Sequence, residues 1–440
     1  MVAKKIQAKL TPEEKLQQAL VPEAEQPYKV PANWCWTRQN IACYLSDIEK
    51  IVNGEHPYLE AKFLRGLKKP KIVSAGKFIN KSSKVILVDG ENSGEVFDIF
   101  VDGYMGSTFR LLCFSEIVYE QYCRYFIIIN KEIYSKSKKG SAIPHLNKEL
   151  FFNMPFPLPP LTEQQRIVER IESLFAKLDE AKENLQNVLE GFETRKAAIL
   201  HKAFTGELTA KWRKQHGVSM ESWESVKVSN LCENIVCGKT PTSYIDNNGD
   251  IPYLKVYNIV NNKIDFDSKP QYIPKKIHES KLKSSILKPK DVIMNIVGPP
   301  LRKIAIIPDT YSEWNMNQAI VRFRTKEKLY YKYLYYYLIY PKTLDDIICE
   351  TKGVVGQANI SITQSRNLNI NLPTFSEQTE IVRIIDELFV KEQQAKELAE
   401  NALSKVDLIK KTILARAFRG ELGTNNPADE SAVELLKRVL

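Results

Sequence analysis

Lysine and arginine side chains gather in one stretch of the chain that holds no acidic residue. No Asp or Glu lies between Glu60 and Asp89. The cations that we predict to contact phosphates there are Lys62, Arg65, Lys68, Lys69, Lys71 and Lys77, with Lys81 and Lys84 beyond them. Clustered cations of this kind neutralise the phosphates of a nucleic-acid backbone. A second basic loop contains Lys138, Lys139 and Ser141. Because a run of charge is more often a solvated surface, the location of these side chains must decide between the two.

Amide and hydroxyl side chains form a second kind of cluster. Asn, Gln and Arg side chains can make paired hydrogen bonds to the edges of bases. The best clusters are Asn315-Met316-Asn317-Gln318 and Gly356-Gln357-Ala358-Asn359. The first half of the chain has a counterpart in Gly106-Ser107-Thr108-Phe109-Arg110. The alternative is a set of ordinary turns, which use the same residue types.

Enzyme signatures are missing from the sequence. Gly238-Lys239-Thr240 resembles the end of a phosphate-binding loop, but Glu233 stands where that loop needs its first glycine. The sequence contains no G-x-G-x-x-G, no H-E-x-x-H and no Asn/Asp-Pro-Pro-Tyr/Phe of the kind that holds a flipped adenine. Gly298-Pro299-Pro300-Leu301 does not replace it. We therefore predict that the chain is not catalytic by itself and holds no metal.

These residues lie in segments that alternate with a long internal repeat. The segment from Leu158 to Leu208 recurs from Leu372 to Leu422 at a constant offset of 214 residues. About 23 of about 51 aligned positions are identical. Both copies begin Leu-Pro, continue with Glu-Gln-x-x-Ile-Val and end Ala-Phe-x-Gly-Glu-Leu. The chain therefore contains an internal duplication.

Each copy is expected to form one long helix. Thr162 and Ser376 are the predicted N-caps, and Gly206 and Gly420 can adopt a left-handed conformation at the C-terminal ends. A heptad seam runs through Ile167, Ile171, Leu174, Leu178, Leu185, Val188 and Phe192 in the first copy, and through Ile381, Ile385, Leu388, Val406, Ile409 and Ile413 in the second. Two seams of equal length most economically bury each other. Packing of each helix on its own globular neighbour is the alternative.

Two charged residues, Arg195 and Glu392, interrupt these seams. Polar residues at core positions of helix pairs fix the register at a cost in stability. Glu392→Leu is therefore expected to raise thermal stability while loosening the preference for one register.

The remaining segments are predicted to be a leader, two globules and a tail. The boundaries are a leader and tether at 1–33, globules at 34–157 and 213–371, helices at 158–212 and 372–422, and a tail helix at 423–440. The expected strands are Val85–Val88, Val96–Phe100, Phe109–Phe114 and Tyr125–Ile129 in the first globule, and Tyr253–Val256, Val292–Val297, Ile304–Ile307 and Ala319–Phe323 in the second.

The tyrosine block Tyr330–Tyr337 is predicted to be a helix packed on a sheet, with base stacking as the alternative. The globules are unlike in sequence, which indicates two different DNA-reading domains on one scaffold.

The composition is typical of a folded protein with a polyanionic partner. The chain has 440 residues, a formal net charge of +10 and a pI near 9.0. No run approaches the roughly 18 apolar residues of a membrane span, and the first residues lack a secretory apolar core. Seven scattered cysteines with no C-x-x-C are expected to stay reduced. We therefore expect a cytoplasmic protein that does not enter a membrane.

At the repeats the sequence resembles the specificity subunit of type I restriction-modification systems. The resemblance is carried by Leu158 to Val168, by the Ala-Phe-x-Gly-Glu-Leu endings, and by the alternation of two variable globules with two repeated helices. Segments similar to that family's target recognition domains are Gly140–His145, Gly238–Pro241, Gly249–Val256, Asn317-Gln318 and Gly356–Ser361. Thr374-Phe375 departs from the Pro-Leu of the first repeat.

The resemblance implies a fold, partners and cofactors. The fold would be α+β, with two α/β target recognition domains separated by two long helices that pack as an antiparallel coiled coil with a pseudo-two-fold internal repeat. Double-stranded DNA, two modification (methyltransferase) subunits and motor-nuclease restriction subunits would be the partners. S-adenosylmethionine, ATP and Mg²⁺ would be bound by those partners and not by this chain. Further residues expected to contact DNA are Lys239, Thr240, Thr242, Lys255, Asn258, Arg302 and Lys303.

Geometry makes the helix pair a candidate ruler. Two modification subunits acting on opposite strands are related by a two-fold axis, which one chain can mimic only if its repeats run antiparallel. A seam from Ile167 to about Ile199 spans roughly 48 Å, or about 14 base pairs of duplex. An orphan bivalent DNA-binding protein, or a coiled-coil adaptor without a methyltransferase partner, is the alternative function.

Overall fold

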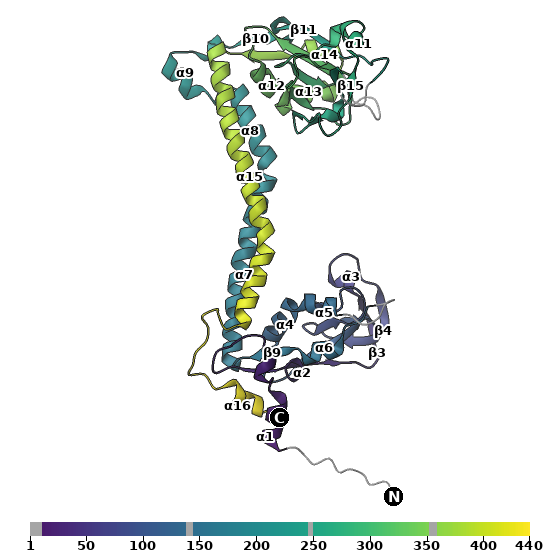
Figure 1. The fold of residues 1–440 in the computed structure, drawn as a ribbon, viewed down its shortest axis with the longest axis vertical. Helices are drawn as coiled ribbons and strands as arrows, with labels where there is room; N and C mark the ends of the chain where they lie inside the picture. The colour runs from purple at the N-terminus through teal and green to yellow at the C-terminus, as the bar shows by residue number, and fades with distance from the viewer. Residues whose placement is uncertain (1–10, 138–143, 245–249, 352–358) are drawn as a thin grey trace. The chain divides into compact units, whose positions relative to one another are not determined.

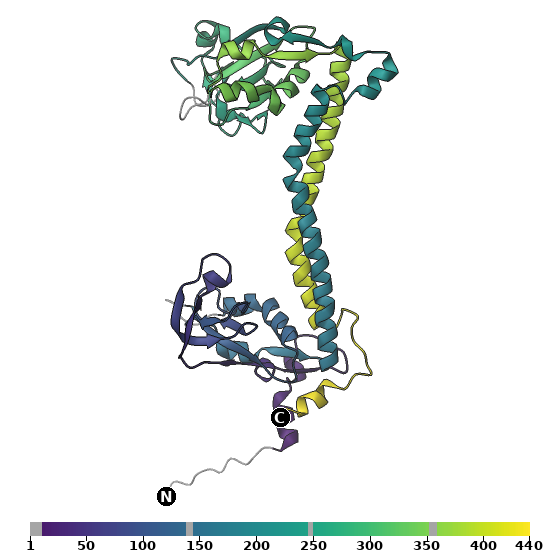
Figure 2. The same ribbon diagram turned by 180° about the vertical axis from the view of Figure 1, so that it is seen from behind.

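The computed structural model describes residues 11–137, 144–244, 250–351 and 359–440. The chain divides into two compact units, and each contains part of both repeats. Unit 1 comprises the chain up to Leu185 together with Asn401–Leu440, and unit 2 comprises Gln186–Glu400 (Figures 1 and 2). A unit therefore combines the beginning of one repeat helix with the end of the other.

Unit 1 is an α+β globule with helices packed against it. Its elements are α1 (Pro12–Ala19), β1 (Cys35–Arg38), α2 (Gln39–Ala42), β2 (Cys43–Ser46), β3 (Ile51–Leu59), α3 (Ala61–Leu64), β4 (Ile72–Ile79), β5 (Lys84–Leu87), β6 (Val96–Asp98), β7 (Gly103–Met105), β8 (Phe109–Phe114), α4 (Glu120–Ile129), α5 (Lys131–Lys136), α6 (Lys148–Asn153), β9 (Pro155–Leu158), the first part of α7 (Leu161–Glu190) and α16 (Ala432–Lys437). Strands β2-β8-β5-β6 form an antiparallel sheet, β1 pairs with β9, and β3, β4 and β7 form a small barrel.

Unit 2 repeats this plan. Its elements are α8 (Phe192–Phe204), α9 (Ala210–His216), β10 (Glu224–Lys227), α10 (Val228–Leu231), β11 (Cys232–Cys237), β12 (Ile251–Leu254), β13 (Ile259–Val260), β14 (Lys263–Ile264), β15 (Tyr272–Ile273), α11 (Lys275–Glu279), β16 (Val292–Asn295), β17 (Ile304–Ile306), β18 (Asn315–Met316), β19 (Ile320–Thr325), α12 (Tyr331–Ile339), α13 (Pro341–Thr351), α14 (Ile362–Arg366), β20 (Asn369–Leu372) and most of α15 (Phe375–Phe418). Strands β11-β19-β16-β17 form its four-stranded sheet, and β10 pairs with β20.

The two globules share backbone pairing although their sequences differ. In unit 1, β3 runs parallel to β7 with Tyr58 opposite Tyr104, and in unit 2, β12 runs parallel to β18 with Tyr253 opposite Asn315. The chain then leaves each pair in the same way. Gly106 N donates to Leu59 O at 3.1 Å, and Asn317 N donates to Leu254 O at 3.0 Å. The loops after β7 and β18 are therefore equivalent, as the comparison of Gly106–Arg110 with Asn315–Gln318 predicted.

Most expected strands are present, and one prediction is wrong. The three earlier strands of the first globule correspond to β5, β6 and β8, and the four of the second correspond to β12, β16, β17 and β19. Tyr125–Ile129 lies instead in α4, where Tyr122, Tyr125 and Phe126 are buried on one side. A short apolar run does not distinguish a strand from a buried helix. The tyrosine block does form a helix, α12, with Tyr333, Leu334 and Tyr336 buried.

The repeat helices differ from the prediction at their beginnings and in one interior position. Thr162 and Ser376 lie inside the helices, because α7 begins at Leu161 and α15 begins at Phe375. Thr374 caps α15 instead, accepting from Glu377 N at 3.4 Å. The first copy is divided at Gly191 into α7 and α8, whereas α15 is continuous over 44 residues. Gly206 and Gly420 have φ of 81° and 72°, which confirms the left-handed helix ends.

Each unit contains two helix segments that run antiparallel. In unit 1, Lys410 Nζ lies 2.6 Å from Asp179 Oδ1, and Leu414 and Phe418 share a core with Ile167 and Ile171. As residue numbers rise along α7, their partners fall along α15. Unit 2 shows the same arrangement, because Lys396 lies 4.8 Å above the Phe192 ring while Phe204 shares a core with Ile381 and Ile385. The last part of α15 lies alongside α7 in unit 1, and its first part lies alongside α8 in unit 2 (Figure 1).

The predicted seam residues are buried to different extents. Ile167, Ile171, Phe192, Ile381, Ile385 and Val406 are buried, whereas Leu174, Leu178, Leu185, Leu388 and Ile413 are half-buried. Val188 and Ile409 are exposed, at 38% and 43%. The seam is therefore well covered where the helices meet a globule and poorly covered at some positions between.

A buried glutamine fastens each globule to the beginning of its own repeat helix. Gln164 accepts from Tyr119 N at 2.7 Å and donates to Ile117 O and Pro159 O. Its repeat equivalent Gln378 accepts from Tyr330 N at 2.8 Å and donates to Lys328 O and Pro373 O. Both tyrosine amides belong to the N-cap of the helix that follows the four-stranded sheet, α4 or α12.

The preceding glutamate fastens the segment that follows the other repeat helix. Glu163 accepts from Thr424 Oγ1 at 2.7 Å and from Arg166 at 2.6 Å. Glu377 accepts from Thr209 Oγ1 at 2.7 Å and from Arg213 at 2.6 Å, while its second oxygen accepts from Trp223 Nε1. Both glutamates are fully buried. Buried carboxylates persist only where such partners compensate the lost hydration.

The two charged seam residues face one another in unit 2. Arg195 Nε lies 2.8 Å from Glu392 Oε2, and Arg195 Nη2 donates to Val188 O at 2.9 Å. Arg195 also lies against Gly191, where a Cβ would approach its guanidinium to 2.5 Å. The sequence alone indicates two independent interruptions of the seams, at Arg195 and Glu392. Because they form an ion pair with each other, the expectation that Glu392→Leu raises thermal stability no longer holds.

We expect Glu392→Leu alone to lower stability slightly, because it leaves a half-buried guanidinium without its carboxylate. Glu392→Leu combined with Arg195→Met should recover the loss, with a coupling free energy of about 0.5–1 kcal/mol. Thermal unfolding of the two single variants and the double variant measures it. Glu400→Leu, at an exposed position of α15, is the matched control. Additive effects of the two single changes would contradict the pairing.

Candidate nucleic-acid interface

Two predicted loops of unit 2 lie against each other. Thr240 Oγ1 donates to Gln318 Oε1 at 2.7 Å, and Lys239 N donates to Met316 O at 3.2 Å. Gly238 makes this approach possible, because a Cβ there would lie 2.1 Å from Asn317 O. Only glycine allows backbone to pass this closely. The loop Gly238-Lys239-Thr240 therefore supports the loop after β18. We call residues 315–318, and the equivalent residues 106–110 of unit 1, the reading loops, because the sequence predicts that they read bases.

The polar side chains of these loops divide into exposed and structural ones. Lys239, Thr240, Thr242 and Gln318 are exposed and can reach a ligand. Asn317 is half-buried, and its Oδ1 is buried without a hydrogen-bond partner among the described residues.

Two predicted contact residues are part of the protein interior instead. Asn315 is fully buried, and its amide lies 3.0 Å from His278 Nδ1 and donates to Leu282 O. Asn258 is also fully buried and accepts from Lys255 N while donating to Asp265 O. The prediction that these two residues contact DNA is therefore wrong. Asn is common at bases and in turns for the same reason, its paired donor and acceptor.

Exposed tyrosines beside lysines were missed by sequence reasoning. Tyr244 and Tyr257 are 38% and 42% exposed. Lys255 Nζ lies 4.7 Å from the centre of the Tyr244 ring, and Lys269 Nζ lies 5.8 Å from that of Tyr257. Rings flanked by cations are suited to bases and phosphates together. The alternation of Tyr253, Lys255 and Tyr257 was the available signal.

The cations after β16 are occupied by internal partners. Arg302 pairs with Asp345 and donates to Pro341 O at 3.0 Å, and Lys303 donates to Val256 O at 3.3 Å. Because these bonds use N–H donors of Arg302 and Lys303, fewer donors remain to bind a DNA phosphate, contrary to the prediction. Asn359 is exposed at a bridge to Val297, and Gln357 lies outside the described residues.

The equivalent reading loop of unit 1 is held by one acidic residue. Asp47 pairs with Lys77, and its other oxygen lies 4.0 Å from Arg110 Nε. The hydrogen bond from Lys77 lowers the pKa of the Asp47 carboxyl. Ser107 is exposed, and its amide donates to Tyr58 Oη at 3.2 Å. Thr108 is half-buried, with its carbonyl accepting from Val88 N.

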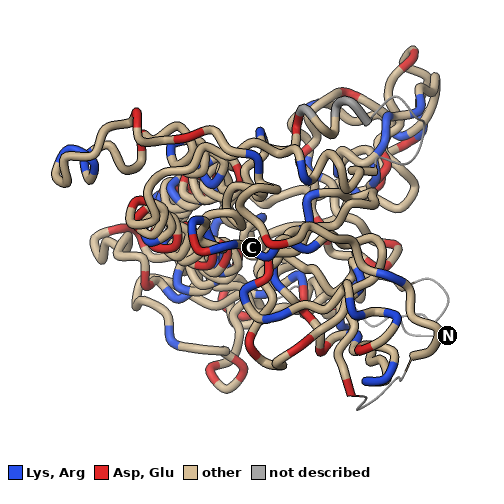
Figure 3. Tube along the Cα trace, turned by 90° about the horizontal axis from the view of Figure 1, so that it is seen from above, with Lys and Arg blue, Asp and Glu red and all other residues tan. Residues whose placement is uncertain are grey.

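The basic stretch of unit 1 is only partly neutralised. Arg65 pairs with Glu95, and Lys68 lies 3.0 Å from Glu60. Lys62, Lys69 and Lys71 are exposed and make no ion pair with any described residue. Lys138, Lys139 and Ser141 lie outside the described residues. Blue and red positions are interspersed along the trace in Figure 3.

Other kinds of site find little support in the described ranges. No three or more His, Cys, Asp or Glu side chains in residues 11–137, 144–244, 250–351 and 359–440 are placed to hold a metal ion. Across the same ranges, no helix is both long enough and apolar enough to span a bilayer. The six described cysteines are free thiols.

Matched strand pairs and the loops that leave them recur in the two globules, and each globule is joined to segments of the repeated helices. The family model of the type I restriction modification DNA specificity domain matches residues 39–191 and 220–400. The matched residues make up most of the chain, so the chain belongs to this family.

Curated relatives agree with this assignment, and a solved structure shares the fold. The chain is 26% identical over 386 residues to the type I restriction enzyme MjaVIII specificity subunit of Methanocaldococcus jannaschii, covering 82% of this chain and 86% of that protein. It is 26% identical to the EcoBI specificity subunit of Escherichia coli, covering 68% and 66%. The fold resembles the crystal structure of the HsdS subunit from Thermoanaerobacter tengcongensis, with a TM-score of 0.64, 18% identity and coverage of 90% and 100%.

We expect Gln318→Ala to change base preference at one position of the DNA site, because its amide is exposed on the loop after β18. The loss of discrimination should be about 1–3 kcal/mol at that base pair. Selection of bound duplexes from a randomised library measures it. Asn315 lies three residues away but is buried. Asn315→Ala should therefore lower thermal stability and leave the preferred DNA sequence unchanged. A change of sequence preference in the Asn315 variant would contradict the assignment of that residue to the interior.

Proposed function

We propose that this chain is the DNA sequence-recognition subunit of a type I restriction-modification complex. Each globule reads one half of a bipartite, asymmetric target. The observation that carries this proposal is the equivalence of the two reading loops. Gly106–Arg110 and Asn315–Gln318 leave matched parallel strand pairs through the same backbone hydrogen bond, yet present different side chains. Equal placement with different chemistry is what a reader of two unlike half-sites needs.

The repeat helices act in this proposal as one antiparallel coiled coil that sets the spacer. Support comes from each unit taken by itself. The segments of both helices run antiparallel in unit 1, where Lys410 meets Asp179, and in unit 2, where Arg195 meets Glu392. The continuous α15 has 44 residues, which corresponds to about 66 Å of helix at ~1.5 Å per residue. A helix pair of that order can separate two reading domains by several unread base pairs.

The chain is non-catalytic in this proposal and depends on its partners for chemistry. Two modification subunits dock on the repeat helices and methylate adenine N6 on both strands, and restriction subunits act as motor nucleases. S-adenosylmethionine, ATP and Mg²⁺ belong to those partners. The helices carry apolar side chains that a partner could cover, because Val390, Leu398 and Leu408 are 56%, 69% and 64% exposed. Co-purification with a methyltransferase subunit tests this arrangement, and its failure would favour an orphan DNA-binding protein.

Replacing residues 34–157 by the corresponding segment of a relative should change one half-site only. The boundaries include β1 and all of β9 except Leu158, so the exchanged globule carries most of this strand pair. Adenine methylation mapping of the genome, with the partner subunits co-expressed, gives the readout. The reciprocal exchange of 213–371 is the control and should change the other half-site. A simultaneous change in both half-sites would refute independent reading.

Inserting four residues after Glu190 should lengthen the spacer without changing either half-site. The insertion adds about 6 Å to one helix, or one to two base pairs of duplex. A library of targets that differ only in spacer length, scored by methylation, measures the preferred spacing. A seven-residue insertion preserves the heptad phase and should require about three extra base pairs. An unchanged spacer with full activity would show that the partner subunits position the globules.

A further inference from the structure

The segment from Glu60 to Lys71 projects from the strand beside the first reading loop. Its base is closed by Tyr58 N donating to Lys71 O at 2.7 Å. Unit 2 closes an equivalent projection, residues 255–271, by Tyr253 N donating to Gln271 O at 2.8 Å. Each projection therefore begins at the end of a strand, β3 or β12. That strand pairs in parallel with the strand that leads into the reading loop, β7 or β18. Any ligand read by residues 106–110 has this projection next to it.

The backbone of the projection presents one apolar side chain in a fixed place. Leu67 N donates to Lys62 O at 2.9 Å, and Gly66 N donates to Phe63 O at 2.8 Å. With Gly66 at φ 73°, these bonds form the left-handed ending of helix α3. The residue at the position of Leu67 usually packs back on its helix in this motif. Leu67 is instead 73% exposed.

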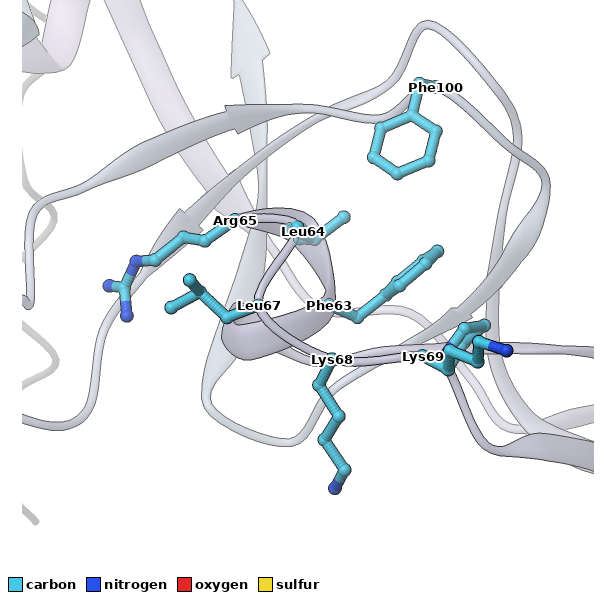
Figure 4. A pocket seen from close by; sticks show the side chains of 9 residues that line it. Phe63, Leu64, Arg65, Leu67, Lys68, Lys69 and Phe100 are labelled. Atoms are coloured by element: carbon cyan, nitrogen blue, oxygen red, sulfur yellow. The ribbon is translucent and has the colours of Figure 1, made fainter. Parts of the chain in front are cut away.

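The surroundings of Leu67 are apolar beneath and cationic at the edge. Phe63 and Phe100 approach with ring centres 5.4 Å apart and line a shallow hollow of about 670 Å³ together with Leu64 and Leu67. Figure 4 shows the Phe63 and Phe100 side chains pointing toward each other on one side of the hollow, with the Lys68 side chain pointing away from them. Phe63 is half-buried and Phe100 is 55% exposed, so the hollow is open to solvent.

The charge of the projection selects a polyanion as its occupant. Glu60 is the only acidic residue from 60 to 88, and it is paired with Lys68. Lys62, Lys69 and Lys71 remain exposed, without an ion pair to any described residue. Proteins that insert side chains into DNA grooves combine an apolar wedge, such as leucine, with cations that bind the flanking phosphates. Leu67 among these three lysines has this composition. Unit 2 places Tyr257, 42% exposed beside Lys269, on its equivalent projection.

We propose that Leu67 is a DNA wedge that enters the duplex beside the half-site read by residues 34–157 and unstacks one base step. Lys62, Lys69 and Lys71 hold the flanking phosphates. The unstacked step makes deformability of the DNA part of the recognised sequence, because flexible pyrimidine–purine steps cost least to open. The inference rests on the proposed recognition function and adds a specificity-determining residue outside the reading loops.

The test uses the full chain in complex with its modification subunits and the mapped target duplex. 2-Aminopurine is placed at successive positions across and beside the first half-site, leaving out the methylated adenine, which methyltransferases flip. We expect a several-fold rise in fluorescence at one step upon saturating binding. Leu67→Ala should abolish this rise, and Leu67→Phe should retain it. Lys69→Ala, the matched control, should weaken binding and reduce the salt slope by about one while leaving the rise at saturation.

The outcomes separate this inference from the proposed function. Saturable specific binding with no fluorescence rise at any position, or a rise that persists in Leu67→Ala, would overturn the wedge and leave the recognition function standing. Loss of assembly with the modification subunits in Leu67→Ala, measured by light scattering, would assign Leu67 to a protein contact and also overturn it. A wild-type complex that binds no specific duplex would overturn the recognition function itself.

Discussion

A buried Glu-Gln pair at the start of each repeat helix holds each unit together. The glutamine makes three hydrogen bonds to backbone groups of the adjoining globule and its linker, in the same pattern at Gln164 and at Gln378. Removing either amide would leave buried donors and acceptors unpaired, each at a cost of about 1–3 kcal/mol. The repeated Glu-Gln of the sequence is therefore structural. Its identity in both copies reflects two globules that dock by the same backbone groups, although their other residues differ.

The glutamates explain why each unit combines both repeats. Glu163, at the beginning of the first repeat, pairs with Arg166 and accepts a hydrogen bond from Thr424, beyond the end of the second. Glu377, at the beginning of the second, pairs with Arg213 and accepts a hydrogen bond from Thr209, both beyond the end of the first. The Ala-Phe endings act with them. Phe418 packs on Tyr122 and Phe126 in unit 1, and Phe204 packs on Tyr333 and Tyr337 in unit 2. Because a buried carboxylate needs its partner, the beginning of one repeat requires the end of the other.

Recognition is assigned to side chains that this scaffold leaves free. The same backbone hydrogen bond is present at the start of both reading loops, from Gly106 N to Leu59 O and from Asn317 N to Leu254 O. The side chains of these loops can therefore be exchanged without disturbing the fold. In unit 2, Gln318 and Lys239 are exposed and Asn315 is buried, and in unit 1, Lys62 and Lys69 are exposed near the half-buried Phe63. Buried polar residues keep the geometry, and the proposed DNA contacts are left to exposed ones.

The duplication, the long helices, their left-handed glycine ends and most strands could be predicted from the sequence, because each depends on local periodicity and backbone preference. The sequence also singled out two loops that occupy equivalent places in the two globules, since amide and hydroxyl clusters between strands are local features. Only the tertiary structure decided which members are available. Asn315 and Asn258 are buried, Arg302 is paired, and Tyr125–Ile129 is helical, because each outcome depends on neighbours that are distant in the chain. The partnership of Arg195 with Glu392, and the exposure of Leu67, likewise follow from long-range packing, which no local pattern encodes.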